Sequence, residues 1–110
     1  MEKPIEVNLT CYKGKTYNQD FYIKQDGQYV DLTGYTPKSQ IRKKENDEEL
    51  IAEFVCGVTA NGLLSLGLSH EVTANLDSGF YKYDVKMVDQ NECVDYWIRG
   101  VFSVIGRVTE

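Results

Sequence analysis

The segment Phe80-Tyr81-Lys82-Tyr83-Asp84-Val85-Lys86-Met87-Val88 decides the class of fold, because its polarity alternates residue by residue over most of its length. The residues at 81, 83, 85 and 87 are aromatic or aliphatic, and those at 82, 84 and 86 are charged. Side chains of a β-strand point alternately to the two faces of a sheet, whereas those of a helix repeat every 3.6 residues. The segment is therefore predicted to be a strand with one buried face and one face in water.

The same alternation recurs along the rest of the sequence and predicts an all-β chain. Gln25-Asp26-Gly27-Gln28 and Asp89-Gln90-Asn91 supply turns. Asn61-Gly62 favours a type I′ hairpin, in which both central residues need positive φ. The segment 50–54 also fits a helical turn, but its β-rich neighbours favour a strand. The predicted strands are Ile5–Cys11, Tyr17–Ile23, Tyr29–Asp31, Ser39–Lys43, Leu50–Cys56, Leu64–Leu68, Phe80–Val88 and Val94–Val104.

Two local features of the segment 69–81 add to this prediction. One short helical turn is expected near residues 70–76, since Ser69 can cap its start. Leu76, Gly79 and Tyr81 form a candidate tyrosine corner, in which the phenol of a late strand binds an upstream backbone group. Seven to eight short strands with such a corner predict an immunoglobulin-like antiparallel β-sandwich, and 110 residues fit a single domain spanning 1–110.

Charge and cysteine content argue against several classes of partner. The formal net charge is −5, and the only basic cluster, Arg42-Lys43-Lys44, is followed at once by the acidic run 45–49. Nucleic-acid binding needs Lys and Arg gathered on one face, so no nucleic-acid partner is expected. No stretch is long and apolar enough for a membrane span, so no membrane partner is expected. Cys11, Cys56 and Cys93 are widely spaced and each is predicted as a small core residue, without zinc or disulfide.

Catalytic chemistry is not expected either. The single histidine, His70, is adjacent to Ser69 in a polar turn, so a surface position is favoured over a catalytic one. Asp84 is the one acid in the middle of a strand of tyrosines, and a surface ion pair with Lys82 and Lys86 is favoured over an active-site carboxyl. No phosphate-binding, dinucleotide-binding, zinc-protease or EF-hand motif is present. The sequence therefore predicts no catalytic residue, no cofactor and no metal.

A few residues fall out of phase with the buried faces and are candidates for a protein interface. They are Phe80, Val88, Trp97, Arg99 and Val101. Trp and Arg are enriched at interface hot spots, and a sheet that is apolar on both faces usually has a partner on each. For Trp97 a second interpretation is equally open, namely that the ring belongs to the core and a bulge shifts the phase by one residue.

Several segments form a pattern that covers nearly the whole chain. The most specific are Asp31-Leu32-Thr33-Gly34-Tyr35-Thr36 and Gly79-Phe80-Tyr81-Lys82-Tyr83-Asp84-Val85, accompanied by Lys13-Gly14-Lys15-Thr16-Tyr17 and Asn61-Gly62. Together they resemble the small immunoglobulin-like proteins and domains of tailed phages, and are similar to the N-terminal domain of phage baseplate upper proteins. The resemblance implies a non-enzymatic virion protein, an adaptor or accessory component of tail, baseplate, neck or head.

The resemblance also implies partners and a location. The partners would be other virion proteins, with a homo-oligomer or symmetric assembly, and the chain would pass from the host cytoplasm into the virion. Baseplate domains of this kind begin longer polypeptides, whereas this chain is expected to be complete, so a free-standing accessory role is equally compatible. The alternative function is a carbohydrate- or cell-surface-binding module, since five tyrosines of the first third offer rings for sugar stacking: Tyr12, Tyr17, Tyr22, Tyr29 and Tyr35.

Overall fold

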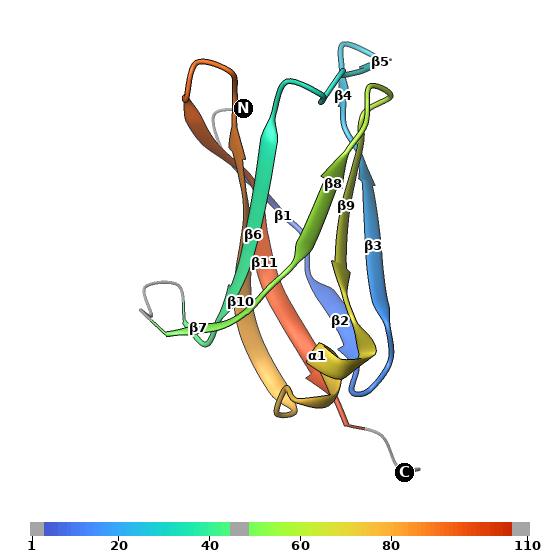
Figure 1. Ribbon diagram of the computed structural model, residues 1–110, viewed down its shortest axis with the longest axis vertical. Helices are drawn as coiled ribbons and strands as arrows, with labels where there is room; N and C mark the ends of the chain where they lie inside the picture. Colours follow the sequence, from blue (N-terminus) through green and yellow to red (C-terminus); the bar gives the residue numbers. More distant parts are fainter. Residues whose placement is uncertain (1–3, 45–48, 107–110) are drawn as a thin grey trace.

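The computed structural model describes residues 4–44 and 49–106 of the chain. Within them the chain forms a β-sandwich with one short helix (Figure 1). The elements are β1 (Ile5–Glu6), β2 (Leu9–Tyr12), β3 (Tyr17–Tyr22), β4 (Lys24–Gln25), β5 (Gln28–Tyr29), β6 (Thr36–Arg42), β7 (Leu50–Glu53), β8 (Val55–Val58), β9 (Leu63–Leu68), α1 (His70–Ala74), β10 (Gly79–Val88) and β11 (Val94–Ile105). The predicted all-β sandwich with one short helix near 70–76 is confirmed.

Two sheets form the layers. Sheet A has the strand order β1-β11-β10-β6-β7, with β2 also paired to β11, and sheet B has the order β3-β9-β8. The strands β4 and β5 form a separate hairpin at one end (Figure 1). The strands β1 and β2 run parallel to β11, so sheet A is mixed where the sequence predicted antiparallel pairing.

The described residues contain more strands than the seven to eight expected, because two predicted strands are divided and the short strand β4 was not predicted. The first is interrupted at Val7 and Asn8, which separate β1 from β2. The second is interrupted at Phe54, where the chain leaves β7 of sheet A and continues as β8 in sheet B. A strand that changes sheets has to bend, and its Phe54 side chain enters the core at the bend, where it is 4% exposed.

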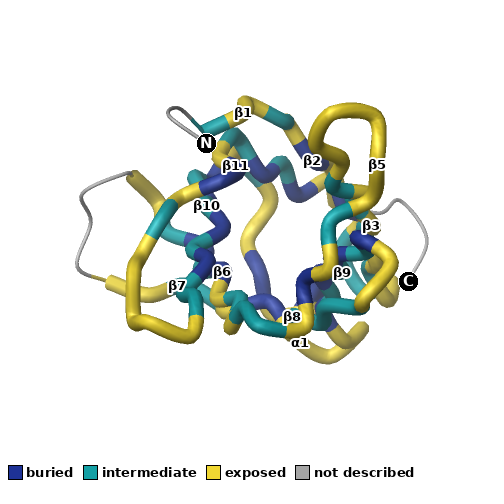
Figure 2. Tube along the Cα trace, turned by 90° about the horizontal axis from the view of Figure 1, so that it is seen from above, coloured by how far each residue is buried: buried dark blue, intermediate teal, exposed yellow. Residues whose placement is uncertain are grey.

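The core lies between the two sheets, where their buried residues face each other (Figure 2). Phe102 of sheet A is fully buried and packs edge-on against Phe54 and Tyr17, each with ring centroids 5.4 Å apart. Phe54 also meets Tyr83 edge-on at 6.1 Å. Edge-to-face aromatic pairs each add about 0.5–1.5 kcal/mol beyond the area that they bury. This aromatic cluster joins the layers.

Of two predicted turns, the one at Gln25-Asp26-Gly27-Gln28 is present, whereas the one at Asn61-Gly62 has another geometry. Asn61-Gly62 was the predicted type I′ turn, but only Gly62 has positive φ, and the closing bond from Thr59 N–H to the Leu63 carbonyl encloses three residues. This geometry fits a three-residue loop with glycine in the left-handed position. The two-residue loop with positive φ at both positions is Asp26-Gly27, between β4 and β5.

The phase of β11 explains Trp97. The strand register shifts between Val85 and Lys86 of β10, which pair with Ile98 and Tyr96, so Trp97 is the extra residue of a β-bulge. Trp97 is 7% exposed, and its ring packs against Tyr35 at 5.0 Å between centroids. The prediction that Trp97 faces outward as an interface residue was wrong, and the core interpretation with a shifted phase holds.

The remaining local predictions differ in outcome. Cys11 is buried and Cys56 is half-buried, but Cys93 is exposed, because it lies in the turn between β10 and β11. That turn is held by the Asp89 carboxylate, which accepts hydrogen bonds from the N–H groups of Asn91 and Cys93. Of the predicted charged loop, residues 45–48 lie outside the described residues. In the described part of the chain, no helix has the length and apolar character needed to cross a membrane.

Candidate protein interface

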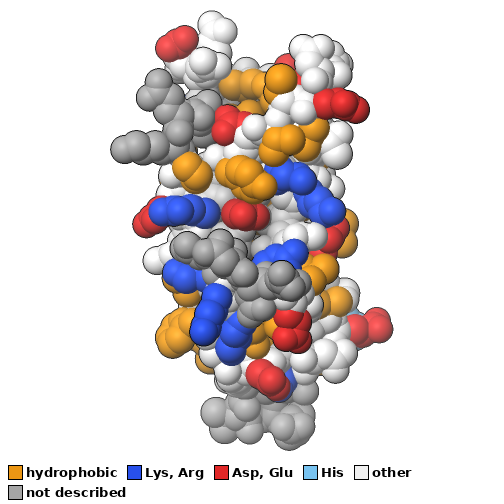
Figure 3. Space-filling model, turned by 90° about the vertical axis from the view of Figure 1, so that its left-hand side faces the viewer, with side chains coloured by type: hydrophobic (Ala, Val, Ile, Leu, Met, Phe, Trp, Pro, Cys, Tyr) orange, Lys and Arg blue, Asp and Glu red, His pale blue; other side chains and the backbone are white. Residues whose placement is uncertain are grey.

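The face of sheet A that points away from the core, here called the outer face, carries most of the predicted interface residues. The buried residues of β10 are those at 81, 83, 85 and 87. Period-two alternation therefore places Phe80, Lys82, Asp84, Lys86 and Val88 on the outer face. Figure 3 views this side of the molecule, with Lys and Arg side chains gathered over the middle and hydrophobic side chains toward both ends.

One end of the outer face is apolar around Phe80, which is 74% exposed. Phe80 pairs with Ser103 of β11, which lies between Val101 and Ile105 on the same face. Val101 is half-buried and Ile105 is exposed. Phe80 and Val101 line a shallow hollow of about 470 Å³. These three apolar residues, Phe80, Val101 and Ile105, are called the Phe80 patch.

The other predicted interface residues lie elsewhere on this face. Val88 is half-buried and pairs with the exposed Val94, beside the exposed Tyr96 on β11. Val88 lies eight positions after Phe80 along β10, about 26 Å at the rise of a strand. Arg99 lies between the two ends, directly across from Asp84. Phe80, Val88, Arg99 and Val101 therefore share one face without forming one cluster.

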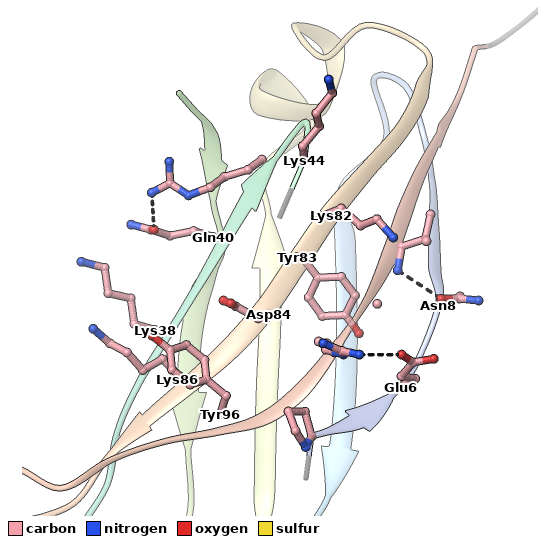
Figure 4. Close-up of a pocket in the computed structure, with 15 residues that line it drawn as sticks. Glu6, Asn8, Lys38, Gln40, Lys44, Lys82, Tyr83, Asp84, Lys86 and Tyr96 are labelled. Atoms are coloured by element: carbon pink, nitrogen blue, oxygen red, sulfur yellow. Dashed lines mark hydrogen bonds and ion pairs between the residues drawn. The ribbon is translucent and has the colours of Figure 1, made fainter. Parts of the chain in front are cut away.

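The middle of the outer face is a hollow of about 570 Å³, here called the basic hollow. Among the described residues, its lining contains six Lys and Arg side chains and two Asp and Glu side chains. The cations are Lys38, Arg42, Lys44, Lys82, Lys86 and Arg99, and the acids are Glu6 and Asp84. Figure 4 labels the four lysines of this set, which rise from neighbouring strands near Asp84.

Sequence reasoning missed the basic hollow because it considered Lys and Arg only where they are consecutive. The signal was present as alternation: Lys38 and Arg42 fall on one side of β6, while Ser39 and Ile41 are buried on the other. Which strands lie beside β6 is decided by long-range pairing, which the alternation does not encode. The statement that Arg42-Lys43-Lys44 is the only basic cluster is thus corrected by the fold.

In the register between β6 and β10, two pairs of directly opposite residues are both cationic. Lys82 lies directly opposite Arg42, and Lys86 lies directly opposite Lys38. Asp84 lies between them, opposite Gln40. Like charges that face each other across a sheet destabilise it. The arrangement therefore places four cationic side chains on two adjacent strands around Asp84.

Asp84 is half-buried rather than fully solvated. Burial raises the pKa of its carboxyl above the ordinary value, and the nearby Arg42 and Lys86 lower the pKa by less. Burial disfavours the charged form of an acid, whereas a neighbouring cation favours it. The predicted surface ion pair therefore describes only part of the environment of Asp84.

Two polar networks fix the edges of the basic hollow. Arg42 Nη2 donates to Gln40 Oε1 at 2.8 Å, and Gln40 Nε2 donates to Glu53 Oε2 at 3.1 Å. On the other side Arg99 Nη2 lies 3.1 Å from Glu6 Oε1 (Figure 4). Both partners of this ion pair are largely exposed, so it contributes at most about 1 kcal/mol. The described residues that line the hollow include no His, Cys, Ser or Thr.

The candidate tyrosine corner has the following geometry. Tyr81 is buried, and its hydroxyl donates to the carbonyl of Asp77 at 2.6 Å. Leu76 is buried beside α1, and Gly79 begins β10. Ser69 caps α1 by accepting a hydrogen bond from the Val72 N–H at 3.3 Å. The Tyr81 hydroxyl therefore ties β10 of sheet A to the segment that follows α1 through a hydrogen bond from side chain to backbone.

The five tyrosines proposed for sugar stacking do not gather. Tyr17 packs in the core cluster, and Tyr35 packs on Trp97. Tyr22 and Tyr29 form an exposed edge-on pair with ring centroids 6.1 Å apart, and Lys24 Nζ lies 4.6 Å from the Tyr29 ring centre. Tyr12 is exposed on β2 of the other sheet. A shared platform of five rings is excluded, and one pair remains.

Comparison with known proteins gives the fold a counterpart. The sequence matches no protein-family model and no curated protein. Among solved structures, the chain is similar to the N-terminal domain of ORF48 of phage TP901-1, with a TM-score of 0.54 and 17% identity over 96% of this chain and 91% of that one. A family 123 glycoside hydrolase from Clostridium perfringens aligns with a TM-score of 0.43 and 11% identity, over 96% of this chain and 24% of that one. The first similarity supports the sandwich fold.

Proposed function

We propose that this chain is a non-enzymatic structural protein of a bacteriophage particle, an adaptor or accessory component that binds other virion proteins through the outer face of sheet A. The observation that carries the proposal is the fold, which matches a phage protein domain along 96% of the chain. The sequence resemblance to baseplate upper proteins points in the same direction. Fold alone does not define function, so the binding face supplies the second argument.

The outer face has the composition of a binding surface. Phe80 is 74% exposed. Contact of a large apolar ring with water is unfavourable, and a partner that covers the ring would remove this contact. The Phe80 patch lies beside polar and charged groups that supply orientation. Protein interfaces combine such an apolar anchor with a polar surround. Many copies in a symmetric particle would add avidity to a weak contact per copy.

Particle composition tests the proposal. In particles purified from the virus that encodes this chain, mass spectrometry should detect it in a fixed ratio to the main capsid protein. Phe80→Glu should lower its incorporation at least tenfold, because the charge would be buried against the partner. Val55→Glu is the matched control, since Val55 is 77% exposed on sheet B, and it should be incorporated normally. Finding the chain only free in the lysate would contradict the virion role.

A cell-surface glycan is a second candidate ligand, and the Tyr22–Tyr29 pair favours it. The two rings are 63% and 55% exposed and contact each other at the end of sheet B. Aromatic rings can stack on the apolar face of a sugar. Binding on a glycan array that disappears in Tyr22→Ala and persists in Phe80→Ala would favour this candidate over the structural one.

A further inference from the structure

We propose that the basic hollow on the outer face of sheet A is the docking site for an acidic segment of a partner protein. The inference rests on the proposed function, since it names the chemistry of the partner that the outer face would bind. The segment would place carboxylates against the cations of β6, β10 and β11. Its apolar residues would cover the Phe80 patch at the end of the same face.

The distribution of charge is the first argument. The chain as a whole is acidic, with a net charge of −5, yet half of its Lys and Arg residues line one hollow. In the described part of the chain, the hollow gathers six cations and two acids on one face, which would attract an acidic partner. Such complementarity steers association and fixes the orientation of the complex.

The cross-strand pairs are the second argument. A sheet that served only stability would place opposite charges across from each other, because such pairs stabilise it. Here Lys82 faces Arg42 and Lys86 faces Lys38. Carboxylates of a partner that lie between Lys86 and Lys38 would replace the repulsion of that pair by attraction. The unfavourable pairing in the free chain is therefore consistent with a surface arranged for its complex.

The acids and apolar groups of this face favour a polypeptide over a nucleic acid. A phosphate backbone carries a charge at each nucleotide and would meet the half-buried carboxylate of Asp84 in the middle of the hollow. A polypeptide can avoid this contact. Lys82 and Lys86 are four residues apart, about 13 Å along the strand. Acidic residues at positions i and i+4 of an extended segment would reach both, with an uncharged residue over Asp84.

The test uses the full chain and a fluorescein-labelled decapeptide that carries glutamate at every fourth position and serine elsewhere, with binding followed by fluorescence anisotropy. The wild-type chain should bind, and added salt should weaken binding because the contacts are electrostatic. The double variant Lys82→Glu/Lys86→Glu should bind at least tenfold more weakly. The control is Lys15→Glu/Lys24→Glu, which changes the net charge equally at two exposed lysines outside the hollow and should bind within twofold of wild type.

Folding of each variant is checked by circular dichroism. If the double glutamate variant does not fold, Lys82→Gln/Lys86→Gln replaces it, because this variant removes the two positive charges without adding negative ones. It should still bind the peptide at least fivefold more weakly than the wild type. Equal loss in the control pair, or no binding by the wild type, would overturn the proposal. Tighter binding of a labelled decathymidylate than of the spaced-glutamate peptide would also overturn it. If the chain binds the peptide but is absent from purified particles, the virion role is contradicted and the binding site for an acidic segment is not.

Discussion

Trp97 and Phe80 lie on the same pair of adjacent strands, but the fold gives them opposite environments. Trp97 is 7% exposed and packs on Tyr35. Replacing a buried Trp by Ala removes contacts and leaves a cavity, which costs about 3–5 kcal/mol. Trp97→Ala should therefore lower the free energy of unfolding by about 3 kcal/mol or more, measured by urea denaturation. An unchanged free energy would contradict the core assignment.

Phe80→Ala is the matched aromatic truncation. Because Phe80 is 74% exposed, most of its surface is already in water in the folded state. Substitutions at such sites usually change stability by less than about 0.5 kcal/mol. Phe80→Ala should thus leave the urea midpoint nearly unchanged. A loss as large as that of Trp97→Ala would mean that Phe80 belongs to the core and not to a binding surface.

The environment of Asp84 predicts a pH dependence. Burial raises the pKa of its carboxyl in the folded chain, so the folded state takes up this proton at a higher pH than the unfolded state. The contribution of Asp84 to stability is therefore fully present below the ordinary carboxyl pKa and is lost as the pH rises through the folded pKa. Asp84→Asn should remove this loss, seen as a flatter profile of unfolding free energy against pH above about pH 4. Parallel profiles would contradict the half-buried environment.

At the scale of elements, the bond between Tyr81 and the Asp77 carbonyl joins β10 to the segment after α1. Tyr81→Phe keeps the buried ring and removes only the donor. The expected loss in unfolding free energy is about 0.5–1.5 kcal/mol, the net value of one such bond. The control is Tyr22→Phe, since the Tyr22 side chain is 63% exposed and its hydroxyl is expected to form hydrogen bonds with water. Equal melting temperatures for the two variants would show that the bond contributes nothing.

The pairing of β6 with β10 gives an element-scale prediction of opposite sign. Lys38 faces Lys86 across the two strands, and removing one charge relieves the repulsion. Lys38→Gln should raise the free energy of unfolding by about 0.2–1 kcal/mol at low salt, and the gain should shrink as salt is added. Lys15→Gln, in an exposed turn, should change it much less. A loss of stability in Lys38→Gln would mean that this lysine has a favourable partner.

For the whole molecule, alternation in the sequence was sufficient to predict the sandwich, because the polar and apolar residues of each strand indicate which of its faces is buried. It was not sufficient for features that depend on two strands at once. The bulge at Trp97 exists only in the register of β11 against β10, and the basic hollow exists only once β6 lies beside β10. The sequence therefore predicted individual residues of the candidate site, namely Phe80, Arg99 and Val101. It did not predict that cations from several strands gather in one hollow.

The cohesion of the two sheets predicts how the whole molecule responds to alkali. Tyr17 of sheet B packs on Phe102 of sheet A, and burial raises the pKa of Tyr17 to about 12 and raises the pKa of Tyr83 as well. The unfolded chain releases these phenol protons near pH 10, before the folded chain does. The stability that they contribute is complete below pH 10 and is lost as the pH rises toward about 12.

Tyr17→Phe isolates one of these groups, because it keeps a ring between the sheets and removes the ionisable hydroxyl. Between about pH 10 and pH 12 the variant should lose less unfolding free energy than the wild type, measured by urea denaturation at each pH. Tyr22→Phe, on an exposed ring, should follow the wild type. Both proteins retain Cys11 and Cys56, and burial also raises the pKa values of these thiols. Both proteins will therefore still lose some stability at high pH. Identical alkaline profiles for wild type and Tyr17→Phe would mean that the Tyr17 hydroxyl reaches water and that the aromatic cluster does not close the sandwich at that position.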